Sequence, residues 1–175
     1  MKDIIKPVIV LASICLVVTT VLACVNSVTA PIIKAAEEKN AALARSEVLK
    51  EARSFEQLDI SLSAGVTGVF KGSDDSGYVI MSQAKGYSGD IKIICGIRSD
   101  GSVEKVKTLL HSETSGIGSK VADNKSGYNQ KYSGTTADSY MNVDAVSGAT
   151  VSSKAYKKAV GLALDTFQKI KEEDK

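Results

Sequence analysis

The chain has 175 residues, with 22 Lys and Arg against 20 Asp and Glu, so its formal net charge is +2 at pH 7. This length suits one membrane segment and one domain of ordinary size. The nearly balanced charge, without an aromatic-basic stripe, argues against nucleic acid as a partner. A single histidine, His111, excludes a metal cage built from several histidines, and we expect no metal site.

The three cysteines are Cys15, Cys24 and Cys95, and none of them forms a CxxC pair. Haem attachment, a zinc ribbon and an iron–sulfur cluster therefore lack ligands. Cys95 is the one cysteine outside the apolar N-terminal run, so no disulfide can form within the rest of the chain. We predict that Cys95 is a small buried apolar side chain.

An uncharged stretch runs from Pro7 to Ile33, and its most apolar part reads VIVLASICLVVTTVLACV. A helix of about 20 residues crosses the roughly 30 Å hydrocarbon core of a bilayer. Such a helix also satisfies its own backbone hydrogen bonds in lipid. The sequence therefore predicts a single-pass transmembrane anchor over residues 7–30, in the lipid bilayer of the cell (inner) membrane.

Basic residues flank this anchor on both sides. Lys2 and Lys6 precede it and favour an N-terminus inside the cell, whereas further basic residues follow it. Long domains cross membranes largely regardless of charge. We expect residues 1–6 to form a cytoplasmic tail and the C-terminal domain to lie on the extracytoplasmic side.

Two alternatives to an uncleaved anchor stay open. A cleaved signal peptide would have a shorter apolar region and a small-x-small cleavage site. The segment VLAC also looks like a lipoprotein cleavage box with Cys24 as the lipidated residue, although Leu22 departs from that pattern. The mass of the mature N-terminus distinguishes these forms.

After Pro31 the segment IIKAAEEKNAALARSEVLKEARSF is rich in alanine and charged helix formers, without Gly or Pro until Gly65. We predict a helical connector over residues 31–60 and a second domain over residues 61–175. At Gly65 the composition changes to short runs of β-forming residues, which read GVTGVFKG, GYVIMSQAKGY, DIKIICGIRSDG and SVEKVKTLL.

The third run alternates between apolar and polar residues, as a half-buried strand does. Its apolar side chains are Ile91, Ile93, Cys95 and Ile97. Asp100-Gly101 marks a turn, so the third and fourth runs predict a hairpin in an antiparallel sheet with one buried face.

A long polar, glycine-rich segment follows the fourth run, and loops of this length in compact domains are often functional. The chain then ends with SSKAYKKAVGLALDTFQKIKEEDK, whose apolar residues recur at helical spacing. We predict an α+β fold, in which an N-terminal transmembrane helix precedes an antiparallel sheet with packed helices.

The segment VSGATVSS, which begins at Val146, crowds small residues around Thr150 immediately before this last helix. Backbone N–H groups at a helix start lack internal partners and favour anions such as phosphate. Ser152 or Ser153 could equally cap the helix, and capping alone explains such residues. No base lies beside Thr150 in the sequence, so its hydroxyl is more plausibly modified than acting as a nucleophile.

The nine residues DAVSGATVS resemble the flavinylation motif of the FMN-binding domain family. Its members include the G subunit of the Rnf complex and the C subunit of the sodium-pumping NADH:quinone oxidoreductase. The matching residues are Asp144, Ser147, Gly148, Ala149, Thr150 and Ser152. The resemblance implies that residues 61–175 form an FMN-binding domain and that Thr150 carries covalent FMN through a phosphoester. It also implies that Ser147, Gly148 and Ala149 belong to the site, and that a separate flavin transferase installs the group from FAD.

A second segment, HSETSGIGSKV, resembles the His-x-Glu-Thr-Pro-Gly-Leu-Gly segment that lines the flavin site in this family. The resemblance implies that Glu113, Thr114, Gly116 and Gly118 bind the cofactor, with Ser115 in place of the usual proline. The same segment contains GIGSK but lacks the GxxxxGK[ST] pattern of a phosphate loop. We therefore do not expect a nucleotide hydrolase.

The resemblance implies a membrane-anchored electron-transfer subunit of an ion-translocating ferredoxin:NAD oxidoreductase (Rnf) complex. Such a chain is a redox carrier rather than a stand-alone enzyme, and its partners are the other membrane subunits. Two alternatives are the C subunit of the quinone reductase and a non-redox membrane-anchored assembly module. Tyr128, Tyr132 and Tyr140 could stack on the flavin ring or simply pack in the core.

Overall fold

The computed structural model describes residues 2–60 and 63–173. Contacts divide the chain into two compact units, with the boundary between Lys39 and Asn40. The first helix, α1 (Lys2–Val48), crosses this boundary, so each unit is described by itself.

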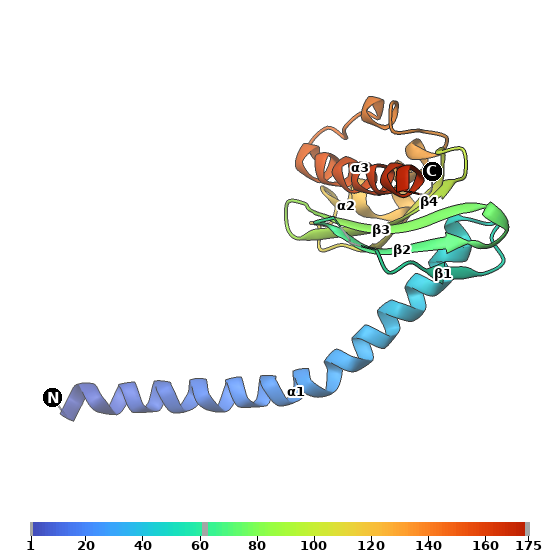
Figure 1. Cartoon of the computed structure of the whole chain (residues 1–175). Helices are drawn as coiled ribbons and strands as arrows, with labels where there is room; N and C mark the ends of the chain where they lie inside the picture. Colours follow the sequence, from blue (N-terminus) through green and yellow to red (C-terminus); the bar gives the residue numbers. More distant parts are fainter. Residues whose placement is uncertain (1, 61–62, 174–175) are drawn as a thin grey trace. The chain divides into compact units, whose positions relative to one another are not determined.

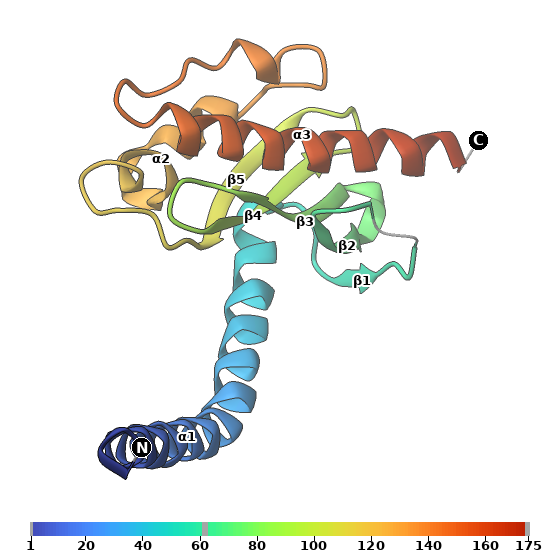
Figure 2. The ribbon, with the colours of Figure 1, turned by 90° about the vertical axis from the view of Figure 1, so that its left-hand side faces the viewer.

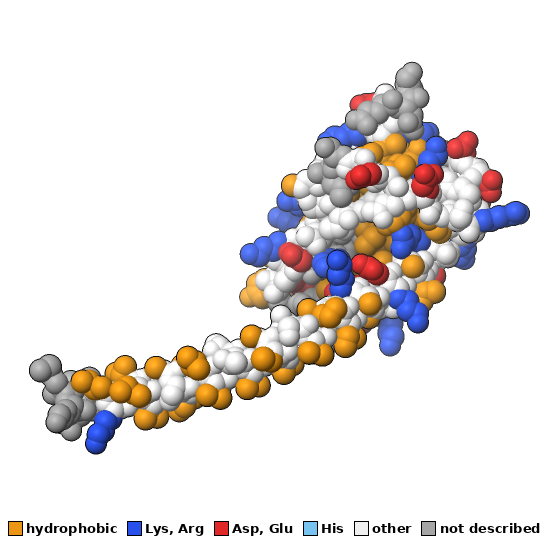
Figure 3. All heavy atoms as spheres, turned by 60° about the horizontal axis from the view of Figure 1, so that its bottom comes forward, with side chains coloured by type: hydrophobic (Ala, Val, Ile, Leu, Met, Phe, Trp, Pro, Cys, Tyr) orange, Lys and Arg blue, Asp and Glu red, His pale blue; other side chains and the backbone are white. Residues whose placement is uncertain are grey.

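In the first unit, α1 presents apolar side chains along its length (Figure 3). Among the described residues, it is the one helix long and apolar enough to cross a membrane. Its hydroxyl side chains donate to carbonyl oxygens three or four residues earlier, as Thr20 does to Leu16 at 2.7 Å. The helix therefore satisfies its own polar groups, as lipid requires. It continues through Pro31 and ends at Val48, before the end of the helical connector predicted up to residue 60.

The second unit contains one antiparallel sheet whose strands follow chain order. The strands are β1 (Phe55–Gln57), β2 (Val66–Gly72), β3 (Gly77–Lys85), β4 (Asp90–Arg98) and β5 (Val103–Leu110). The four predicted β runs correspond to β2 to β5, whereas β1 was not predicted. The hairpin between β4 and β5 is confirmed, with Gly101 in the left-handed region at φ 88° and Ser102 N–H donating to Asp100 Oδ1.

Helix α3 (Thr150–Glu173) lies across one face of the sheet (Figures 1 and 2). Its apolar stripe, which includes Ala159 and Leu164, packs against Ile80 and Ile93 of the central strands. The segment between β5 and α3 contains short helical turns, namely α2 (Ser119–Ala122), η2 (Asn124–Ser126), η3 (Tyr128–Tyr132) and η4 (Tyr140–Asn142). These turns cover the end of the same core. The α+β fold is confirmed.

Cys95 lies on this covered face and is fully buried, as predicted. Burial raises the pKa of its thiol to about 12, so the reactive thiolate is absent at neutral pH. Tyr128, Tyr132 and Tyr156 form a buried cluster nearby, with ring centroids 5.6 to 5.8 Å apart.

The opposite face of the sheet is also buried, so the prediction of a single buried face is wrong. Phe70, Val79 and Ile94 pack there against Ala44, Val48, Leu49 and Ala52 from the end of α1 and the turn after it. Gly96 permits this approach, because a Cβ atom at that position would lie 2.0 Å from the carbonyl oxygen of Val48. The sequence does carry a signal for this, because Val79 and Ile94 each stand between two apolar residues, and a short continuous apolar run is consistent with a strand buried on both faces.

Candidate functional site

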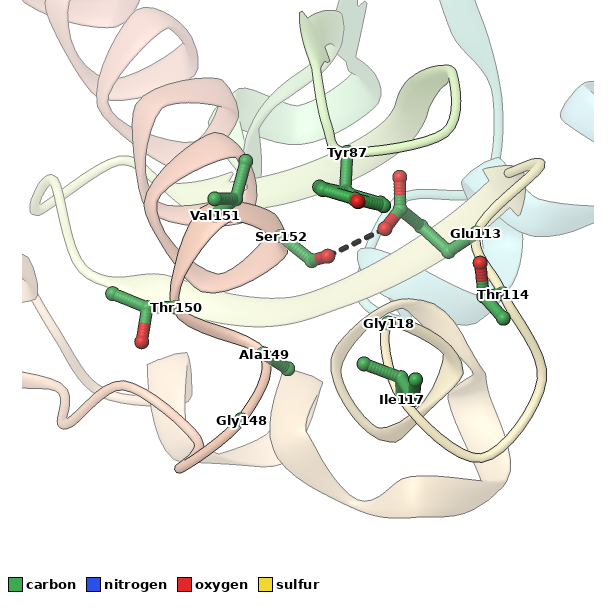
Figure 4. Close-up of a pocket in the computed structure, with 10 residues that line it drawn as sticks. All are labelled: Tyr87, Glu113, Thr114, Ile117, Gly118, Gly148, Ala149, Thr150, Val151 and Ser152. Atoms are coloured by element: carbon green, nitrogen blue, oxygen red, sulfur yellow. Dashed lines mark hydrogen bonds between the residues drawn. The ribbon is translucent and has the colours of Figure 1, made fainter.

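Three loops meet at one end of the sheet and enclose a cavity of about 420 Å³. They are the β3–β4 hairpin tip, the loop after β5 and the turn before α3 (Figure 4). The lining residues are Tyr87, Glu113, Thr114, Ile117, Gly118, Gly148, Ala149, Thr150, Val151 and Ser152. The volume falls within the range of sites that bind small organic ligands.

Local hydrogen bonds and one left-handed glycine fix the conformation of the turn before α3. Gly148 has a φ of 78°, in the left-handed region where residues with a Cβ are strained. Ala149 N–H donates to the Val146 carbonyl at 2.9 Å, and Val146 N–H donates to Ser153 Oγ at 3.0 Å. The first residue of α3 is therefore Thr150, at the N-terminal end that favours negative charge.

The prediction that Ser152 or Ser153 precedes and caps this helix is wrong, because both lie inside its first turn. Ser153 Oγ donates to the carbonyl of Ala149, four residues earlier, at 2.9 Å. Ser152 Oγ instead donates across the cavity wall to Glu113 Oε2 at 2.5 Å. Both serines are buried, and their hydroxyl hydrogens are already used.

These contacts separate the four hydroxyl side chains of the turn. Ser147 and Thr150 are exposed, and of these two only Thr150 lines the cavity. In Figure 4 the Thr150 side chain lies on the other side of the helix start from Ser152 and does not point toward Glu113. Among the four hydroxyl side chains of this turn, Thr150 is thus the exposed one that lines the cavity.

Glu113 joins all three loops. Its side chain is 8% exposed, and its two carboxylate oxygens accept from Ser88 N–H at 3.1 Å and from Ser152 Oγ. Its own backbone N–H donates to Nδ1 of His111 at 3.3 Å. Next to it, the hydroxyls of Thr114 and Ser88 lie 3.1 Å apart.

Six of the eight residues predicted for the site line the cavity, and Ser147 and Gly116 do not. Gly116 has a φ of 77°, and its N–H donates to Ser119 Oγ, so this glycine shapes the loop instead of facing the cavity. Gly118 approaches Glu113 so closely that a Cβ atom there would lie 2.2 Å from Oε2.

The sequence did not single out three apolar side chains that line the cavity and are exposed. They are Tyr87, Ile117 and Val151, with exposed fractions of 75%, 54% and 51%. Exposed aromatic and aliphatic side chains around a cavity suit a flat apolar ligand. The available signal for Tyr87 was an aromatic residue between two glycines, in the segment GYSG that separates the second and third predicted β runs.

The tyrosines that were candidates for stacking lie elsewhere. Tyr128 and Tyr132 are buried in the core, and Tyr140 packs half-buried beside Gly161 of α3. None of these three lines the cavity. The packing alternative is therefore the one that their positions support.

Metal ligands are not gathered at this cavity. Within residues 2–60 and 63–173, no group of three or more His, Cys, Asp and Glu side chains could hold a metal ion. The arrangement instead combines an accessible hydroxyl, a helix start, glycine backbone and apolar walls. It fits a ligand with an anionic end and a flat ring system.

A family model for the FMN-binding domain matches residues 86–165. All ten lining residues fall inside that range. The G subunit of the ion-translocating oxidoreductase complex of Methanosarcina acetivorans is 30% identical over an alignment of 178 positions that covers 94% of each chain. The chain belongs to the family of these G subunits.

Other members of the G subunit family show the same relationship. The G subunit of the Na⁺-translocating ferredoxin:NAD⁺ oxidoreductase complex from Acetobacterium woodii is 28% identical over 91% of each chain. The G subunit of the ion-translocating oxidoreductase complex of Shewanella piezotolerans is 38% identical over an alignment of 98 positions that covers 50% of this chain and 46% of that one.

Proposed function

We propose that this chain is a membrane-anchored electron-transfer subunit of an ion-translocating ferredoxin:NAD oxidoreductase (Rnf) complex, and that it carries FMN covalently on Thr150. The observation that carries the proposal is an exposed hydroxyl, that of Thr150, which lines the cavity at the start of α3 and beside apolar walls. Bound FMN supplies the electron-transfer chemistry, while the protein fixes its place and surroundings.

Exposure supports Thr150 as the attachment residue. The hydroxyls of Ser152 and Ser153 are buried and donate to other groups, and Ser147 lies outside the cavity lining. The attachment transfers FMN from FAD: a bond forms between Thr150 Oγ and the flavin-side phosphorus as the phosphoanhydride bond breaks. The threonine proton is lost, and AMP leaves. In this proposal a separate flavin transferase catalyses the step.

The walls of the cavity suit the two ends of FMN. The phosphate would lie at the N-terminal end of α3, where unpaired N–H groups and the helix dipole stabilise negative charge. The flat ring would lie among Tyr87, Ile117 and Val151, whose exposed apolar surfaces would then be covered. Gly148, with nothing within 4 Å of its Cβ position, lets the backbone approach the cofactor.

The chain acts as one electron-carrying subunit of a larger complex. Its described residues include a single candidate membrane span, and the relatives that resemble it along more than nine-tenths of their length are subunits of complexes. The other membrane subunits are its partners. We infer that α1 anchors the chain in the cell membrane and that the FMN-binding domain lies on the extracytoplasmic side.

The test is to produce the full chain with a flavin transferase and to separate it on a denaturing gel. A fluorescent band at the mass of the chain is expected for the wild type and for Thr150→Ser, and a dark band is expected for Thr150→Ala. Thr150 is exposed, so its loss should leave the fold intact. A fluorescent Thr150→Ala band would place the attachment elsewhere, and a dark wild-type band would contradict covalent FMN.

Two other functions agree less well with these observations. The quinone-reductase C subunit shares the attachment chemistry, but the relatives from Methanosarcina, Acetobacterium and Shewanella are G subunits. A non-redox assembly module would leave the cavity without flavin and would give the dark wild-type band. The G subunit assignment agrees best with the resemblance along 94% of the chain.

A further inference from the structure

We propose that the Glu113 carboxylate is a fixed negative charge in the cavity wall that lowers the reduction potential of the bound flavin. The inference rests on the proposed function, because it requires FMN in this cavity. It goes beyond the attachment, since it assigns to one buried side chain the tuning of the cofactor.

Glu113 occupies a central position in the site. It lines the cavity together with Tyr87 and Thr114, and Figure 4 shows its carboxyl group between the hairpin tip and the start of α3. Its side chain is 8% exposed. A charge at this place is screened less by water than a charge on the surface.

Both side-chain oxygens of Glu113 accept hydrogen bonds. Ser88 N–H can only donate, and it reaches Oε1 at 3.1 Å. Ser152 Oγ reaches Oε2 at 2.5 Å and donates to it. Each oxygen therefore has one donor that holds it in position.

This charge has no counter-ion among the described residues, because none of their ion pairs within 4.0 Å involves Glu113. The backbone N–H of Glu113 donates to Nδ1 of His111 at 3.3 Å. The negative charge of Glu113 is therefore not neutralised by a contacting cation. This distinguishes it from Glu47, which pairs with Lys107 at 2.7 Å.

The backbone also keeps the carboxylate in place. A Cβ atom on Gly86 would lie 2.3 Å from Oε1, and one on Gly118 would lie 2.2 Å from Oε2. The backbone at Gly86 therefore packs against Oε1, and the backbone at Gly118 packs against Oε2. Glu113 is a positioned charge and not a flexible surface acid.

Reduction adds negative charge to a flavin ring. A fixed carboxylate in the wall of a half-enclosed cavity disfavours that added charge by Coulomb repulsion. Protein charges near the ring are one of the means by which a protein tunes a flavin. The reduced cofactor is therefore destabilised, and the potential is lower than it would be with a neutral residue at position 113.

The test compares the midpoint potential of the flavin in the full chain, matured with the transferase, between the wild type and Glu113→Gln. Glutamine keeps the size of the side chain and an acceptor oxygen but removes the charge. We expect a shift to a more positive potential. Thermal unfolding of the apo-proteins, measured in parallel, should give similar midpoints for the two chains.

Two matched variants separate charge from structure. Ser152→Ala removes a hydrogen bond but keeps the carboxylate, so its potential should move less than that of Glu113→Gln. Glu104→Gln removes another largely buried carboxylate near the start of β5, whereas Glu113 follows the end of that strand; the stretch from Glu104 to Leu110 alone spans about 20 Å at ~3.3 Å per residue, so this variant should leave the potential unchanged.

A wild-type potential in Glu113→Gln would overturn the proposal. So would an equal shift in Ser152→Ala, which would assign the effect to the hydrogen bond. Failure of Glu113→Gln to fold or to take up flavin would overturn it too, since Glu113 would then be a structural residue. A wild-type chain without flavin is a separate outcome, which contradicts the proposed function itself and this inference with it.

Discussion

At the scale of single residues, Gly148 is the position where backbone conformation bears most directly on flavin attachment. Its φ is 78°, and a Cβ atom there would meet nothing within 4 Å. Gly148→Ala should therefore cost about 1 kcal/mol in the free energy of unfolding through backbone strain alone. We expect the yield of covalent flavin to fall as well, because the strain displaces the turn that presents Thr150.

Gly134 offers a matched control for this substitution. It has a φ of 77°, a Cβ atom added to it would also meet nothing within 4 Å, and it lies outside the cavity lining. Gly134→Ala should lower stability by a similar amount in urea unfolding while the flavin yield stays at the wild-type level. Equal loss of flavin in both variants would show that general stability, and not the turn, controls attachment.

Substitution of Tyr87 should affect the flavin spectra and not the stability of the domain. Because its side chain is 75% exposed, Tyr87→Ser should change the free energy of unfolding by no more than about 0.5 kcal/mol. If the ring of Tyr87 covers the flavin, the same change should alter the visible absorption and increase the fluorescence of the bound cofactor. Absorption and emission spectra identical to the wild type would remove Tyr87 from the flavin site.

At the scale of elements, the end of α1 belongs with the domain that follows it. Ala44, Val48 and Leu49 are at most 1% exposed because they cover the outer face of the sheet. Burying a valine or leucine side chain contributes about 1.5–3 kcal/mol. Losing several such contacts is comparable with the whole stability of a typical domain, about 5–15 kcal/mol.

Two truncations test this assignment. A chain that begins at Asn40 should unfold cooperatively, whereas one that begins at Ser54 should lack a cooperative transition, with Phe70, Val79 and Ile94 uncovered. Far-UV circular dichroism during heating measures both. Equal cooperativity and equal midpoints in the two chains would contradict a structural role for the segment from Asn40 to Arg53.

The elements that the sequence predicted are those with a strong local signal. The strands β2 to β5 have β-rich runs between glycine-containing turns, and α3 has a clear helical period. Strand β1 has three residues and follows a helix-forming segment, so its pairing with β2 depends on contacts distant in sequence. The burial of the second sheet face likewise depends on where the end of α1 docks.

For the site, the sequence predicted the two loops that carry Glu113 and Thr150, because short motifs mark them. It missed Tyr87, Ile117 and Val151, since an exposed apolar residue becomes meaningful only when three loops meet around one cavity. It also misassigned Ser152 as a cap. The partner of its hydroxyl is 39 residues away in the chain, and no local pattern indicates that contact.

At the scale of the whole molecule, α1 should keep the chain in the membrane. The full chain should stay in the membrane fraction after a high-salt or alkaline wash, whereas a chain that begins at Asn40 should be recovered in the soluble fraction. The physical reason is the free energy of burying an uncharged apolar helix in lipid. Release of the full chain by the wash would contradict a transmembrane anchor, and a mature N-terminus at Cys24 would favour the lipoprotein alternative.

The side of the membrane is tested by labelling. Cys95 is buried and protonated at neutral pH, and Cys15 and Cys24 lie within the proposed membrane anchor, so none of the three should react with a membrane-impermeant maleimide. Exposed Asp138, changed to cysteine, supplies a reactive position in the domain. We expect labelling of Asp138→Cys from outside the cell membrane and none of the wild type. Labelling only after lysis would place the domain in the cytoplasm.

The mass of the natively purified chain tests the central proposal most directly. The account predicts a mass greater than that of the polypeptide by one FMN less one water, and fragmentation should assign the added group to the peptide that contains Thr150. A mass equal to that of the unmodified polypeptide, from cells that contain the flavin transferase, would contradict it.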